Sequence, residues 1–65
     1  MKYQVRLTGG NLGAQDKVVF ETEQRSEAIA KMVQVRRLRN DAPYNNYDSV
    51  KVFKGDECTN KIDLY

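Results

Sequence analysis

The stretch SEAIAKMVQVRRLR, residues 26–39, decides the fold, because it predicts one amphipathic helix flanked by segments typical of strands. Its apolar residues recur with the 3.6-residue period of a helix that buries one face. Ser26 is expected to begin the helix, since its hydroxyl can accept a hydrogen bond from a free amide of the first turn. Asn40 and Pro43 are expected to end it. The residues predicted to form the buried stripe are Ala28, Ile29, Met32, Val33 and Val35.

Two strands are predicted before this helix. Residues 2–8 alternate between apolar and polar side chains, which is typical of a half-buried strand. Residues 17–22 are rich in β-branched and aromatic side chains, and they predict a second strand. The glycine-rich stretch 9–16 is expected to be a flexible connection, so antiparallel pairing of the two strands is the economical arrangement. The side chains predicted to face the helix are Tyr3, Val5, Leu7, Val18 and Phe20.

After the helix, residues 50–53 predict a third strand, with the two valines of the stretch facing inward. Ile62 and Leu64 stand at alternate positions, but polar residues interrupt the pattern, and it leaves open whether residues 58–65 pair or fray. The sequence therefore predicts a single small α+β domain over residues 1–65. The predicted elements follow in the order β-β-α-β, and a further strand is a candidate at the C-terminus. They form a mostly antiparallel sheet of three to four strands. One amphipathic helix packs on one face of this two-layer sandwich.

The composition excludes several classes of site. The 65 residues carry 11 Lys and Arg against 9 Asp and Glu, a net charge of +2, and they include no histidine and one cysteine. Cys58 therefore has no internal disulfide partner, and a structural zinc site, which needs four Cys or His ligands, is not expected. Cys58 is instead predicted to be a half-buried strand residue. Without histidine the commonest general base is missing, so we expect no enzyme activity and no cofactor.

The sequence also bears on location and assembly. It has no apolar run long enough to span a membrane, and its first residues, MKYQVRLT, lack the apolar core of a secretory signal. The expectation is a cytoplasmic protein with no membrane partner. Domains of this size fold without help, so a monomer or a weak homodimer is expected.

The first predicted function is protein binding through the C-terminal end of the helix and the tyrosine-containing loop that follows it. Tyrosine and asparagine in a loop supply contact area and adaptable hydrogen bonds, which are enriched at protein interfaces. Arginines in a last helical turn also complement the helix dipole, and that simpler interpretation stays open. Tyr44 is expected to be exposed and Tyr47 to lie closer to the core. The candidate partner-binding residues are Arg36, Arg37, Arg39, Tyr44, Asn45 and Asn46.

The alternative function is nucleic-acid binding by basic residues of the helix end and of the outer sheet face. Residues 1–39 carry eight Lys and Arg against four Asp and Glu, whereas residues 40–65 carry three against five. Basic side chains beside an exposed aromatic ring are typical of sheets that bind single-stranded nucleic acid. The net charge of only +2 argues against a general nucleic-acid binder. The candidate residues are Lys2, Arg6, Lys31, Arg36, Arg37, Arg39, Lys51 and Phe53.

Overall fold

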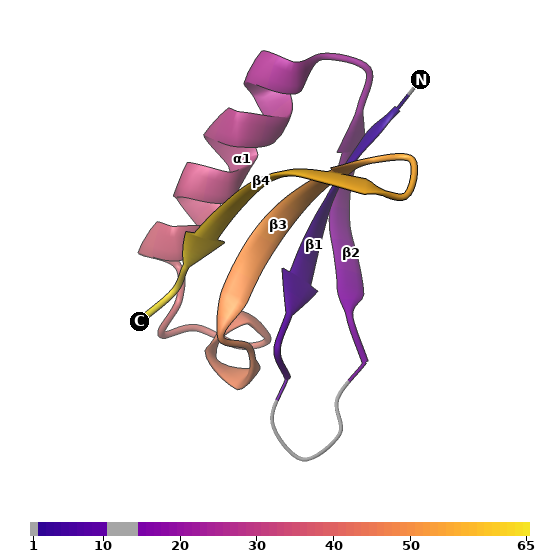
Figure 1. Cartoon of the computed structure of the whole chain (residues 1–65). Coiled ribbons are helices and arrows are strands. Elements are labelled where there is room, and N and C mark those ends of the chain that lie inside the picture. The colour runs from indigo at the N-terminus through magenta and orange to yellow at the C-terminus, as the bar shows by residue number, and fades with distance from the viewer. Residues whose placement is uncertain (1, 11–14) are drawn as a thin grey trace.

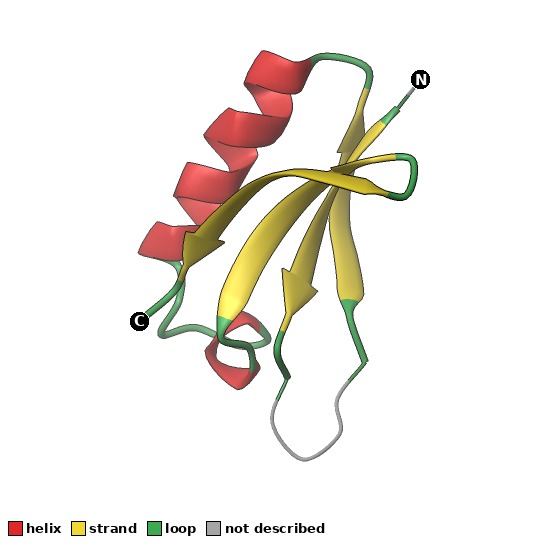
Figure 2. Ribbon diagram, viewed as in Figure 1, coloured by secondary structure: helices red, strands yellow, loops and turns green. Residues whose placement is uncertain are grey.

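The computed structural model describes residues 2–10 and 15–65, which form one antiparallel sheet with a helix packed on one face (Figure 1, Figure 2). The α+β two-layer fold predicted from the sequence is therefore confirmed. The C-terminal segment pairs as a fourth strand. The elements are β1 (Tyr3–Thr8), β2 (Lys17–Thr22), α1 (Arg25–Arg37), the short 3-10 helix η2 (Tyr44–Asn46), β3 (Ser49–Lys54) and β4 (Glu57–Asp63).

The strand order is β2-β1-β3-β4, and every neighbouring pair is antiparallel. Because β2 and β3 lie on opposite sides of β1, the chain between them must cross the sheet, and α1 makes this crossing (Figure 1). Gly55 and Asp56 join β3 to β4, with a φ of 63° at Gly55 that suits the first position of a tight hairpin turn. Residues 11–14 of the predicted flexible connection lie outside the described residues.

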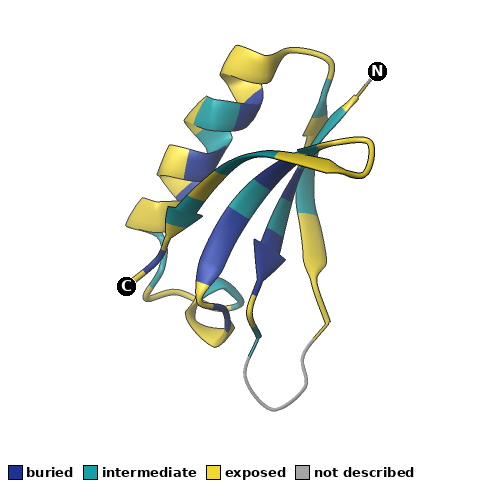
Figure 3. Ribbon diagram, viewed as in Figure 1, coloured by how far each residue is buried: buried dark blue, intermediate teal, exposed yellow. Residues whose placement is uncertain are grey.

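The buried apolar residues of α1 and of the sheet form one core cluster, and Figure 3 shows buried positions in dark blue on α1, β1 and β3. Tyr3, Val19, Phe20, Tyr44 and Ile62 are partly buried and pack against its edge. The helix therefore contacts all four strands on one face of the sheet, and no other helix of the described residues covers the opposite face. The buried apolar residues of the core are Val5, Leu7, Ala28, Met32, Val35, Tyr47, Val50, Val52 and Leu64.

The buried stripe of α1 is narrower than the sequence predicts. Val33 is 41% exposed, and Ile29 is only partly buried, so the prediction that Val33 belongs to the core is wrong. Successive residues of a helix are rotated by about 100°, so Val33 lies a quarter-turn or more beyond Met32. A sheet contacts one narrow line of a straight helix, and that line here consists of Ala28, Met32 and Val35.

A β-bulge reverses the predicted facing of β2. Val5 pairs with Phe20, but the next residue of β1, Arg6, pairs with Val18, which leaves Val19 as the extra residue. An extra residue shifts the alternation of side chains by one position beyond it. Val18 consequently lies on the outer face at 43% exposure, while Val19 packs against the core. The prediction that Val18 points inward is therefore wrong.

Two further predictions, for Ser26 and for Cys58, are also wrong. The helix begins at Arg25, and its N-cap residue is Gln24, whose side chain makes no capping hydrogen bond. Ser26 therefore lies within the first turn and is not the N-cap residue. Thr22 organises this end instead: its hydroxyl accepts from the Gln24 amide at 3.1 Å and donates to Glu27 Oε2 at 2.8 Å. Cys58, predicted to be half-buried, is exposed, because it pairs with Phe53 on the outer face of the edge strand β4.

Gly9→Ala is expected to lower the free energy of unfolding by about 1–2 kcal/mol. Gly9 has a φ of 73°, a left-handed conformation, and an added Cβ would come within 3.0 Å of the Cβ of Asp48. Denaturant unfolding of the variant would measure the loss. Gly10→Ala is the matched control, since left-handed backbone occurs at Gly9 and Gly55 among the described glycines. Equal losses in both variants would contradict a special role for Gly9.

Candidate functional site

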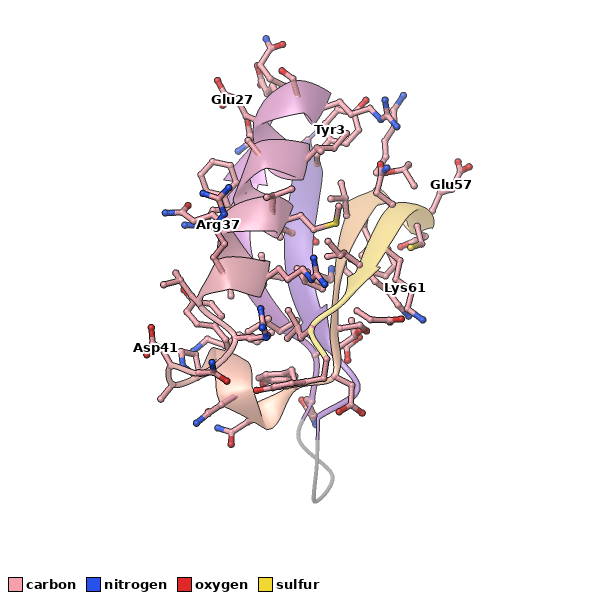
Figure 4. All side chains as sticks on the ribbon, turned by 90° about the vertical axis from the view of Figure 1, so that its left-hand side faces the viewer. Tyr3, Glu27, Arg37, Asp41, Glu57 and Lys61 are labelled. Carbon is pink, nitrogen blue, oxygen red and sulfur yellow. The ribbon has the colours of Figure 1, made fainter. Side chains whose placement is uncertain are left out.

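The arginines at the C-terminal end of α1 are accessible. Arg36 and Arg37 are exposed, and Figure 4 shows Arg37 on the side of α1 away from the sheet. Arg39 is partly buried, and its Nη1 donates to the main-chain oxygen of Arg36 at 3.2 Å, which caps the end of the helix. Asn45 and Asn46, in η2, are exposed as well. Four of the six candidate partner-binding side chains are therefore open to solvent at this end of the molecule.

Of the two tyrosines of the loop, Tyr47 agrees with the sequence prediction and Tyr44 does not. Tyr47 is buried, and its hydroxyl donates to the main-chain oxygen of Gln15 at 3.1 Å. Tyr44 is partly buried and packs against the core, so the prediction that it is substantially exposed is wrong. Tyr44 begins the compact turn of η2, which the hydrogen bond from the Tyr47 amide to the Tyr44 oxygen at 3.2 Å closes.

A different tyrosine occupies the surface at the helix end. Tyr65 is 70% exposed, and its hydroxyl donates to the main-chain oxygen of Arg39 at 2.7 Å. The adjacent Leu64 holds this segment in place, because its side chain is buried and its amide donates to the Asp48 oxygen at 2.9 Å. Sequence reasoning missed Tyr65, since only the pairing of β4 brings it beside the helix.

The outer face of the sheet, opposite α1, carries the second set of candidates. Arg6 pairs with Lys51, and Lys51 pairs in turn with Lys61, so three cations stand in one row across β1, β3 and β4. Figure 4 shows Lys61 on the side of the sheet away from the helix. Lys2, just before β1, is exposed. Lys61 is not among the residues predicted from the sequence, although its position next to the apolar Ile62 in an alternating strand was a usable signal.

Arg6 is held in a defined position within this row. Its guanidinium lies over the Phe53 ring, with 4.4 Å from Cζ to the ring centroid. Two of its N–H groups donate to Gln4 Oε1, from Nε at 2.9 Å and also from Nη2. Gln4 Nε2 donates in turn to Glu21 Oε2 at 3.3 Å. These contacts link side chains of β2, β1 and β3, and they fix the plane of the guanidinium on the open face.

The positive charges of the row are only partly neutralised. The one ion pair within residues 2–10 and 15–65 joins Lys61 Nζ to Asp63 Oδ1 at 3.6 Å, and both side chains are well exposed. Such a surface pair contributes little to stability. Like charges directly opposite each other on neighbouring strands are destabilising, so the pairing of Arg6 with Lys51 and of Lys51 with Lys61 carries a cost.

Lys31 belongs to another surface. Its Nζ lies 5.7 Å from the centroid of the Phe20 ring and donates to Gln34 Oε1 at 3.3 Å. It lines a shallow, open groove between α1 and β2, together with Phe20, Glu27, Ala30 and Gln34. The eight residues of the nucleic-acid alternative are thus divided between two faces. The sheet carries Lys2, Arg6, Lys51 and Phe53. The helix and its C-terminal end carry Lys31, Arg36, Arg37 and Arg39.

Comparisons of the chain with protein-family models, with curated proteins and with solved structures found no significant match. Among the described residues there is no group of three or more His, Cys, Asp or Glu side chains placed to hold a metal ion. No helix in the described part of the chain is long and apolar enough to cross a membrane. Function has to be inferred from the geometry of the two surfaces.

Proposed function

We propose that this protein binds nucleic acid through the outer sheet face, using Arg6, Lys51 and Lys61 with Lys2 beside them. The observation that carries the proposal is the row of three cations in register across β1, β3 and β4, on a face that no helix within residues 2–10 and 15–65 covers. We propose that it acts by binding and not by catalysis, in the cytoplasmic location predicted from its sequence.

A bound polyanion offsets the electrostatic repulsion among the three cations of the row. Neighbouring strands are about 4.8 Å apart, so the three Cα atoms span on the order of 10 Å. Phosphates that bind along such a row release condensed counterions, which supplies a favourable and salt-dependent free energy. Fixing Arg6 on Phe53 and Gln4 before binding reduces the side-chain entropy that would otherwise be lost.

Protein binding at the C-terminal end of α1 is the second candidate function. Tyr65 favours it, because this exposed tyrosine bonds to Arg39 just after the helix end that carries the exposed Arg36 and Arg37. Tyrosine and arginine are residue types enriched in binding hot spots. In this candidate surface Tyr65 replaces Tyr44, and the other candidate residues remain Arg36, Arg37, Arg39, Asn45 and Asn46. This surface lies at the end of α1 and not on the outer sheet face, so substitutions in each surface test the two candidate functions separately.

A salt titration with matched variants distinguishes the two surfaces. Binding of a fluorescent single-stranded oligonucleotide is followed by anisotropy at several salt concentrations. Each phosphate contact on a single strand contributes a slope of about −0.7 in log affinity against log salt. Lys51→Gln is expected to make the slope shallower by about 0.7, whereas Arg37→Gln, which removes a charge from the helix face, leaves it unchanged.

The opposite result, in which only Arg37→Gln changes the slope, would move the site to the helix end. Absence of any oligonucleotide binding by the native protein at low salt would contradict the nucleic-acid proposal altogether. Thermal unfolding of both variants serves as the control for folding.

A further inference from the structure

We infer that the sheet face binds single-stranded nucleic acid in preference to duplex, and that a nucleobase stacks on the guanidinium of Arg6. This inference rests on the proposed nucleic-acid function and specifies its ligand. Charge alone would attract any polyanion, so the inference depends on the arrangement of Gln4, Arg6 and Phe53 and not on the lysines.

The first step is the layered geometry. The guanidinium of Arg6 lies over the Phe53 ring, with 4.4 Å between Cζ and the ring centroid. A guanidinium stacked on a ring has a second planar face, and the sheet side that carries it is not covered by α1. Unpaired bases stack on arginine planes as well as on aromatic rings. The pair therefore forms a prebuilt platform on which a base would be the third layer.

The second step is the remaining hydrogen-bonding capacity. An arginine has five N–H donors. Two of them donate to Gln4 Oε1, and the other three have no protein acceptor among residues 2–10 and 15–65. Lys51, the partner of Arg6 in the ladder, lies beside this platform. One site thus offers a plane for a base, in-plane donors for base-edge or phosphate oxygens, and an adjacent cation for the backbone.

The third step concerns the form of the nucleic acid. In a duplex the flat faces of the bases are occupied by their neighbours in the stack, so a duplex offers this platform only its phosphates. The major groove of B-DNA admits a helix or a two-stranded ribbon. The outer face here belongs to a four-stranded sheet, with Arg6 on one of its two central strands. A single strand, whose bases can turn toward the protein, fits this position.

The test compares three probes of equal length: a single-stranded oligonucleotide, its blunt duplex, and a single strand made of abasic sites. The native protein is expected to bind the single strand about tenfold or more tightly than the abasic strand, which matches the stacking of one base. The duplex is expected to bind at about the level of the abasic strand.

Arg6→Lys keeps the charge and removes the planar group. It is expected to lower single-strand affinity about tenfold and to leave abasic and duplex affinities within about twofold. Gln4→Met provides a second variant, because it removes the acceptor that positions the guanidinium while Arg6 stays in place. It is expected to act in the same direction, and thermal unfolding reports whether each variant is folded.

The outcomes separate the two proposals. If the native protein binds all three probes equally, and Arg6→Lys changes nothing, nucleic-acid binding stands and the stacking inference is overturned. If none of the probes binds at low salt, the proposed function itself fails. A loss of affinity for all three probes in a folded Arg6→Lys variant would also overturn stacking, since the abasic strand has no base to lose.

Discussion

Leu7→Ala is expected to lower the free energy of unfolding by about 2–5 kcal/mol. Leu7 is fully buried near the C-terminal end of β1, where it is a member of the core that joins α1 to the sheet. Truncation removes apolar contacts and leaves a cavity that rigid neighbouring strands cannot close completely. A domain of this size has a total stability of only several kcal/mol, so the variant would be close to unfolded. Denaturant unfolding followed by circular dichroism measures the difference.

Val33→Ala is the control for this experiment. Val33 is apolar and lies in the same domain, but it is 41% exposed, so its truncation is expected to change stability by no more than about 0.5 kcal/mol. Alanine also has the higher helix propensity, which acts in the stabilising direction. A loss at Val33 as large as the loss at Leu7 would contradict the narrow buried stripe of α1 described above.

Lys51→Glu is expected to weaken binding of a single-stranded oligonucleotide by about tenfold or more at low salt. The same substitution is expected to keep or raise the stability of the protein, by up to about 1 kcal/mol. The reason is that Lys51 stands between Arg6 and Lys61 in the ladder, so a carboxylate there would replace two repulsive neighbours by two attractive ones. A loss of affinity without a loss of stability would show that the row of like charges serves binding and not folding.

Lys54→Glu is the matched control for charge. It makes the same change in net charge on the same strand, but Lys54 pairs with Tyr3 at the end of β3, with its Nζ 5.9 Å from the tyrosine ring. Its effect on affinity is expected to be much smaller than that of Lys51→Glu. Equal losses would show that overall charge, and not the row on the outer face, determines binding.

The sequence alone supported the kind and order of the elements. The alternation in residues 2–8 and the 3.6-residue period in residues 26–39 reflect backbone geometry that each segment carries by itself. For that reason the helix, the antiparallel sheet and their two-layer packing agree with the prediction. The same alternation placed Arg6, Lys51 and Phe53 together on the outer face, and the ladder of β1 and β3 confirms this grouping.

The predictions that were wrong concern contacts between segments far apart in the chain. Val18 turns outward because β2 contains a bulge opposite Val5 and Arg6, and a bulge exists only in relation to a paired strand. Val33 is exposed because the sheet meets a narrow line of α1. Tyr44 packs on the core, while Tyr65 reaches the helix end through β4.

The candidate site, like the fold, was predictable from the sequence only in part. The sequence determined which side chains are basic and that those of one strand share a face, because side chains alternate at every residue of an extended chain. Only the tertiary structure decided that Lys61 completes the row with Arg6 and Lys51, and that Gln4 and Phe53 hold the guanidinium in place. Register between strands is set by the pairing of distant segments and by the core they share, which no local pattern encodes.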